Sequence, residues 1–167
     1  MTAGTAKDVA AVVAVAGELV GRTRLQKTVA LLEMSGLGFG FFFQYYKFGP
    51  YSEALSTALD FSIALGYVSE EEKRANWGGR YSIYNSSFSG GDLSPSARSL
   101  ISLAKAADAV ALELAATAAF LAQEGVASPW DEVLARKPEK SESLAKAKLL
   151  YGKLRQISGL PKALPAI

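Results

Sequence analysis

The stretch from residue 67 to residue 84 most constrains the fold of this 167-residue chain. Tyr67-Val68-Ser69 begins a β-strand, Trp77-Gly78-Gly79 has the composition of a turn, and residues 80–84 (RYSIY) alternate as a returning strand does. Elsewhere the apolar residues recur mostly at helical spacing. The sequence therefore predicts one β-hairpin within a mainly α-helical chain.

Three helices are expected before this hairpin. Apolar spacing predicts the first over residues 6–20 and the second from an N-cap at Thr23, with Gln26 as its capping-box partner, to about residue 35. The third is predicted over residues 52–65. Three helices followed by a hairpin is the element order of a winged helix.

An aromatic segment and a turn separate the second and third helices. Residues 39–46 are expected to be extended, and Gly49-Pro50 is a turn signal that places Ser52 as the N-cap of the third helix. Phe61 of that helix is expected to face inward. Of the aromatic residues, four are expected to build core: Phe41, Phe43, Tyr45 and Phe48.

The rest of the chain is expected to be helical. A break is predicted near Ala107-Asp108, a short helix from Ser128-Pro129, and a last helix from Ser141 to about residue 157. The predicted organisation is a winged-helix-like domain over residues 1–91, a helical subdomain packed on it over residues 92–159, and a loose tail over residues 160–167.

The composition excludes several kinds of chemistry. The chain has no cysteine and no histidine, so thiolate zinc sites, cysteine nucleophiles and a Ser-His-Asp triad are impossible within it. No catalytic residue, metal or cofactor is predicted, and the absence of cysteine fits a cytoplasmic protein. An enzyme that uses carboxylates or tyrosines would need a pocket holding two polar side chains with displaced pKa values.

The charge distribution argues against DNA recognition by the third helix. Residues 1–91 carry eight basic and eight acidic side chains, and the outward positions expected on that helix include Glu53 and Asp60 but no Arg, Lys, Asn or Gln. Arg and Lys are the usual readers of guanine, and Asn and Gln of adenine. Carboxylates on this face would be repelled by a phosphate backbone.

Two surfaces are candidate binding sites. The first joins the start of the second helix to the aromatic turn, and its predicted partner-binding residues are Arg22, Arg24, Gln26, Lys27, Lys47, Tyr51 and Ser52. The plain alternative is an exposed polar face with a good cap. The second is the hairpin, where the residues that would contact nucleic acid are Lys73, Arg74, Trp77 and Arg80. Its alternative is a solvated hairpin with the tryptophan packed at its base.

These segments also carry a family resemblance. GRTRLQKTVALLE, then FQYYKFGPYSEAL and ALGYVSE, resemble the YwgA-like bacterial proteins and the wider Panacea (SocA-type) antitoxin-domain group. The matching residues are Arg24–Lys27, Tyr45, Tyr46 and Phe48–Ser52; the stretches ELAATAAFLAQEG and KPEKSESLAKAKLLYGKL are similar to the helical half of the YwgA-like group. The resemblance implies a small cytoplasmic bacterial protein and, for Panacea-type members, neutralisation of a toxin by protein contact.

The expected function is therefore a non-catalytic protein-interaction module, antitoxin-like, whose partner is a toxin or another cytoplasmic protein. The alternative is a winged-helix transcriptional regulator that binds DNA through the hairpin and the Arg22–Lys27 patch. No contact with a membrane is expected, and a homodimer is the default expectation for such a domain.

Overall fold

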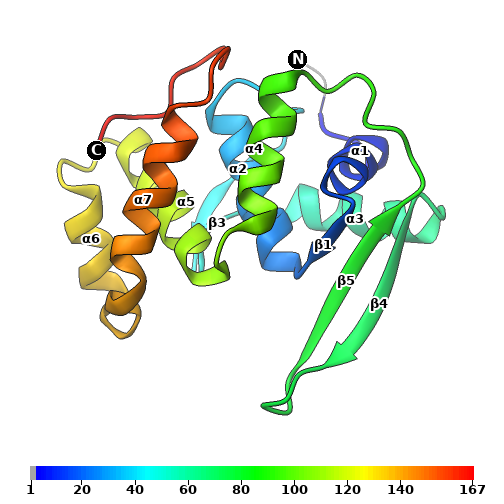
Figure 1. Cartoon of the computed structure of the whole chain (residues 1–167), viewed down its shortest axis with the longest axis horizontal. Coiled ribbons are helices and arrows are strands. Elements are labelled where there is room, and N and C mark those ends of the chain that lie inside the picture. Colours follow the sequence, from blue (N-terminus) through cyan, green and yellow to red (C-terminus); the bar gives the residue numbers. More distant parts are fainter. Residues whose placement is uncertain (1–2) are drawn as a thin grey trace.

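The protein is described by a computed structural model that places residues 3–167. The chain is mainly α-helical, as predicted, with short strands that include the expected hairpin (Figure 1). In chain order the elements are α1 (Ala6–Ala16), β1 (Glu18–Val20), α2 (Arg22–Met34), β2 (Gln44–Tyr46), β3 (Gly49–Tyr51), α3 (Glu53–Ala64), β4 (Val68–Arg74), β5 (Arg80–Ser86), α4 (Pro95–Ala106), α5 (Ala109–Gln123), α6 (Pro129–Arg136), the 3-10 helix η1 (Pro138–Ser143) and α7 (Leu144–Arg155).

The predicted hairpin is strands β4 and β5, which pair antiparallel from Val68↔Ser86 to Arg74↔Arg80 and project from the helical body (Figure 1). A third strand, β1, pairs with the other edge of β5, so the sheet order is β1-β5-β4. The predicted first helix was too long, because α1 ends at Ala16 and Gly17 takes a φ of 79°. Leu19 is buried opposite Tyr84, which is why the apolar pattern continues into the strand.

Helix α2 begins two residues earlier than predicted and lacks the expected capping box. Its N-cap is Gly21, which offers no side chain, and the Gln26 amide is engaged elsewhere. At the other end, Glu33 accepts hydrogen bonds from the backbone N–H groups of Phe39 (2.8 Å) and Phe41 (3.1 Å). This carboxylate shapes the loop, so only residues 44–46 of the predicted extended segment form a strand.

The prediction for α3 was right at its start and wrong on one face. Ser52 caps the helix by accepting a hydrogen bond from the Leu55 N–H at 3.1 Å. Phe61, expected inside, is exposed, and Ser62 is buried. The buried stripe Leu55, Ala58, Leu59 continues at helical spacing to position 62, and the Ser62 hydroxyl is satisfied there because it donates to Ala6 O at 2.9 Å.

The C-terminal half follows the predicted order. Asp108 caps α5 by accepting from the Ala111 N–H at 3.0 Å, which confirms the predicted break between α4 and α5. The last helix starts at Leu144, after the 3-10 turn η1, rather than at Ser141. No helix in the described part of the chain has the length and apolarity needed to cross a membrane.

One hydrophobic core joins the two halves. The main cluster of buried side chains draws on α1, α2, α3, α4, α5 and α7, so the predicted boundary at residue 91 does not separate two cores. A smaller cluster lies between α5, α6 and α7. Residues 160–167, predicted as a loose tail, pack on this body: Leu164 is buried, and the Tyr151 hydroxyl donates to Pro165 O at 2.6 Å.

Candidate functional site

Residues 45–52, which contain most of the β2–β3 hairpin and the N-cap of α3, are called the aromatic turn below. The start of α2 holds this segment in place. The Gln26 side-chain amide donates to Ser52 O at 2.9 Å and accepts from the Ser52 N–H at 2.8 Å. One residue on, Lys27 Nζ donates to Pro50 O at 2.6 Å. Two adjacent side chains of α2 therefore satisfy buried backbone groups of residues 50 and 52, so the two predicted motif segments are joined in space.

Helix α5 supports the same turn from the other side. Gly49 has a φ of 91°, and a Cβ at this position would lie 2.1 Å from Thr117 Oγ1. Thr117 is buried, and its hydroxyl donates to Glu113 O at 2.7 Å, so it is not free to move away. The turn can approach α5 this closely only because residue 49 lacks a side chain.

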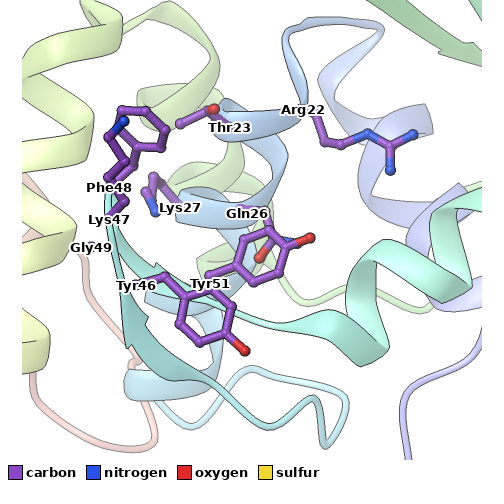
Figure 2. Close-up of a pocket in the computed structure, with 9 residues that line it drawn as sticks. All are labelled: Arg22, Thr23, Gln26, Lys27, Tyr46, Lys47, Phe48, Gly49 and Tyr51. Carbon is purple, nitrogen blue, oxygen red and sulfur yellow. The ribbon is translucent and has the colours of Figure 1, made fainter.

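Between α2 and this turn lies a pocket of about 320 Å³ (Figure 2). Its walls are mostly apolar, and the rings of Tyr46 and Tyr51 stack along one side, with centroids 5.1 Å apart and planes inclined by 17°. In Figure 2, Lys27 lies between Phe48 and Tyr51. The lining residues are Arg22, Thr23, Gln26, Lys27, Tyr46, Lys47, Phe48, Gly49 and Tyr51.

Lys27 is the unusual residue of this pocket, because its side chain is only 2% exposed. Burial lowers the pKa of Lys27 from 10.5 to about 8; the nearby Glu113 carboxylate opposes that shift, and the Lys137 and Lys140 ammonium groups reinforce it. A buried lysine ammonium normally lies beside a carboxylate. Within residues 3–167, Lys27 Nζ donates one hydrogen bond, to a backbone carbonyl, and forms no salt bridge.

The C-terminal half adds a second group of lysines beside the pocket. Glu113 of α5 is 4% exposed and lies 3.6 Å from Lys137 Nζ and 2.5 Å from Lys140 Nζ. Lys137 Nζ also donates to Lys47 O at 2.9 Å. The exposed ring of Phe48 lies among three ammonium groups, at 5.5 Å from Lys47, 5.8 Å from Lys137 and 5.4 Å from Lys140, within the range of cation–π attraction.

Five of the seven predicted partner-binding residues line the pocket, and two do not. Arg24 donates to Ala104 O at 2.8 Å and to Ala107 O at 2.6 Å, so it caps the end of α4. Ser52 is buried as the cap of α3.

The five lining residues differ in how far they reach the solvent. Gln26 and Lys27 are buried, whereas Lys47 is exposed. Arg22 donates to Ser56 Oγ and to Asp60 Oδ1, both at 3.0 Å, and Figure 2 shows its guanidinium directed away from the tyrosines. Within the Arg22–Lys27 patch, Gln26 and Lys27 therefore act mainly by building the pocket, and Arg24 by capping α4.

Sequence reasoning missed part of the site. Tyr46 was given as part of the extended aromatic segment and of the family motif but not as a partner-binding residue, and Phe48, expected in the core, is exposed. Glu113, Lys137 and Lys140 lie far along the chain from the turn, with the Lys137–Lys47 bond joining residues 90 positions apart, and no local pattern in the sequence indicates that they meet it. Of the other aromatics expected in the core, Phe41 is buried and Phe43 and Tyr45 are half-buried.

The hairpin residues predicted for nucleic-acid contact are on the surface, and part of their charge is neutralised. Lys73 lies 3.9 Å from Glu71, and Arg80 lies 3.7 Å from Glu72. Trp77 is at the hairpin tip with 80% exposure, so it is not packed at the base as the alternative interpretation expected. Arg74 pairs with Arg80 across the strands, next to the tip.

The pocket meets one condition for a catalytic site and lacks another. Two of its side chains have displaced pKa values: burial lowers the pKa of Lys27, and the nearby Glu53 carboxylate raises the pKa of Tyr46. However, among the described residues no hydrogen bond joins Lys27 to another titratable side chain, as a nucleophile and its base would be joined. No group of three or more Asp or Glu side chains in residues 3–167 is placed to hold a metal ion.

Comparison with family models, curated proteins and solved structures finds no match to this chain. The resemblance to YwgA-like and Panacea-type proteins therefore stays a prediction, carried by the motif residues alone.

The buried position of Lys27 predicts a pH-dependent stability. The unfolded chain, with a lysine pKa of 10.5, binds more protons than the folded chain, with a pKa of about 8, so stability rises as pH increases through this window. Between pH 7.5 and pH 9.5 we expect the free energy of unfolding of the wild-type protein to gain about 2 kcal/mol relative to Lys27→Met. Urea unfolding followed by tryptophan fluorescence measures this.

Lys7→Met is the matched control for this measurement, because Lys7 is exposed on α1. It should retain the wild-type rise between the two pH values. A Lys27→Met protein whose stability follows the same pH profile as the Lys7→Met protein would show that Lys27 keeps an ordinary pKa.

Proposed function

We propose that this chain is a non-catalytic protein-interaction module in a bacterial cytoplasm, antitoxin-like in its mode of action. Its N-terminal half is winged-helix-like, and the pocket between α2 and the β2–β3 turn is the contact site for a partner protein. The helix and strand order, with β1 pairing along the hairpin, supports the winged-helix assignment.

The observation that carries the proposal is an apolar pocket whose rim exposes aromatic rings beside several lysines. Tyr46 and Phe48 are 40% and 50% exposed there, at the mouth of the pocket that they line. A concave, mostly apolar site with a few converging polar groups is the usual form of a binding pocket. Exposed aromatic anchors are also enriched where proteins meet proteins.

The alternative function, DNA binding by a transcriptional regulator, receives less support. The exposed face of α3 carries Glu53 and Asp60, and in the hairpin Lys73 and Arg80 lie beside glutamates. In the Arg22–Lys27 patch, Gln26 and Lys27 are buried, so they are not presented to a duplex. A regulator would show duplex affinity that falls steeply with salt, and Arg74→Ala with Trp77→Ala would weaken it.

A photo-crosslinking experiment tests the protein-contact proposal. Benzoyl-phenylalanine in place of Phe48, on the pocket rim, should form a protein adduct in cells of the source organism. The same probe in place of Leu149, an exposed residue of α7, is the matched control and should not form it. The adduct at residue 48 should disappear when Tyr51→Ala removes one wall of the pocket.

Other outcomes decide between the alternatives. An adduct of twice the mass of the chain would identify the partner as a second copy. Crosslinking only to nucleic acid, or equal yields at residues 48 and 149, would contradict the proposal.

A further inference from the structure

The buried lysines beside the pocket outnumber the buried carboxylates. Lys27 and Lys137 are 2% and 5% exposed, and Lys140 is partly buried, yet the same cluster holds one carboxylate, that of Glu113. Both Glu113 oxygens are already occupied, one by each of the other two lysines. Buried charges in proteins are paired, because an isolated one is strongly disfavoured. Within this cluster, Lys27 is therefore the ammonium group without a carboxylate beside it.

Lys27 lines the pocket and has unused hydrogen-bonding capacity. An ammonium group has three N–H donors, and Pro50 O accepts one of them at 2.6 Å. The N-terminus of α2 adds to the local positive potential, because Gly21 supplies no side-chain cap and Thr23 of its first turn lines the same pocket. Both features favour an anionic group at this position.

The walls indicate what this anion is attached to. The stacked rings of Tyr46 and Tyr51 and the ring of Phe48 offer flat apolar surfaces around the same cavity. A volume of about 320 Å³ is at the low end for a ligand pocket, which suits one large residue better than a chain passing through. The ligand is therefore an end group with an apolar or aromatic body.

We propose that the pocket captures the C-terminal carboxylate of a partner polypeptide whose last residue is aromatic or large and aliphatic. Lys27 is the charge partner of the carboxylate, and Tyr46 and Tyr51 pack against the terminal side chain. This assignment rests on the proposed function as a protein-interaction module and names the part of the partner that is bound.

A carboxylate suits the site better than a phosphate group. Phosphate is usually held by the fork of an arginine or by several backbone N–H groups together. Arg22 is engaged with Ser56 and Asp60, so one buried ammonium is the main donor. A single ammonium balances the single charge of a carboxylate and would leave a phosphate dianion half-compensated.

Calorimetry with short probes tests the assignment on the full chain. We expect acetyl-Gly-Ala-Phe with a free carboxylate to bind at pH 7, and the same peptide with a C-terminal amide to bind about 30-fold more weakly or not at all. Lys27→Met should weaken the free-carboxylate peptide by a similar factor, whereas Lys7→Met should not. Because Lys27→Met changes a buried residue, Tyr46→Ala on the exposed wall serves as a second variant and should weaken both peptides.

The affinity should also fall by about tenfold between pH 7 and pH 9 as Lys27 loses its proton. The charged groups around it are Glu113 of α5, Lys137 between α6 and η1, and Lys140 of η1. Lys47 and Arg22 line the same pocket, but the Arg22 guanidinium is bonded to Ser56 and Asp60. Lys27→Met should abolish this pH dependence. An affinity independent of pH in the wild-type protein would contradict the role given to Lys27.

The other probes separate the possible failures. Equal affinity for the free-carboxylate and amide peptides would overturn the carboxylate assignment. It would not affect the proposed function, which the photo-crosslinking at residue 48 tests separately. Binding of 3-phenylpropionate without binding of any peptide would overturn the polypeptide assignment. Tighter binding of phenyl phosphate than of 3-phenylpropionate, or no saturable binding of any probe, would overturn the site.

Discussion

Replacing Gly49 by alanine is expected to lower the free energy of unfolding by about 3–5 kcal/mol. Two effects add. The φ of 91° is strained for any residue with a Cβ, and that Cβ would lie 2.1 Å from Thr117 Oγ1 of the buried helix α5. Relief of the contact requires the turn to move outward, and this would break the bonds that Gln26 and Lys27 make to it. Urea unfolding monitored by circular dichroism measures the loss.

Gly78→Ala is the matched control, because Gly78 has nearly the same φ, 90°, with no atom within 4 Å of the added Cβ. It should cost only the backbone strain, about 1 kcal/mol. Adding Thr117→Ala to Gly49→Ala should recover about 1–2 kcal/mol, since the two positions are in contact. Equal losses for Gly49→Ala and Gly78→Ala would show that α5 does not constrain the turn.

Gln26→Leu is expected to destabilise the protein by about 3 kcal/mol. The substitution preserves much of the side-chain volume but removes both hydrogen bonds to the buried backbone of Ser52. The Ser52 N–H is then left without its partner in a buried position, at a cost of about 1–3 kcal/mol, and the apolar side chain meets the polar start of α3. Thermal or urea unfolding at pH 7 gives the change.

The control for this substitution is Gln123→Leu, on an exposed position at the end of α5, which should change stability by less than about 0.5 kcal/mol. We also expect Gln26→Leu to weaken partner binding at temperatures where the protein is folded, because the turn forms one wall of the pocket. A Gln26→Leu protein as stable as Gln123→Leu would contradict the role assigned to the amide.

The sequence was most informative where a local signal is strong. Ser52 and Asp108 mark helix starts, and the alternation of residues 80–84 marks a strand, because each depends on backbone preferences of a few residues. The Gly49-Pro50 signal lies just after the turn it indicates, since the turn is Lys47-Phe48 and Gly49 begins β3. Strand β1 escaped detection because its three residues continue the apolar pattern of α1, and its partner β5 lies more than sixty residues away. Pairing at that distance has no signature in one sequence.

The candidate site illustrates the same limit. Its N-terminal members were predicted as a cluster, since Arg22, Gln26 and Lys27 share one end of a helix. Their burial was not predicted, because lysine and glutamine are usually exposed and only the packing of the turn on α5 covers them. The contribution of Glu113, Lys137 and Lys140 follows from how η1 and the residue before it pack against α5, which is a property of the assembled fold.

The most direct test of the central claim is the pKa of the Lys27 ammonium, followed by NMR in protein with isotope-labelled lysine and assigned with Lys27→Met. We predict a pKa of about 8 in the free protein, rising by about one unit or more when acetyl-Gly-Ala-Phe with its free carboxylate is bound. The amide peptide should leave the pKa unchanged. A Lys27 pKa near 10.5 in the free protein, or one that the free-carboxylate peptide does not alter, would contradict the claim that Lys27 binds an anionic group of the partner in this pocket.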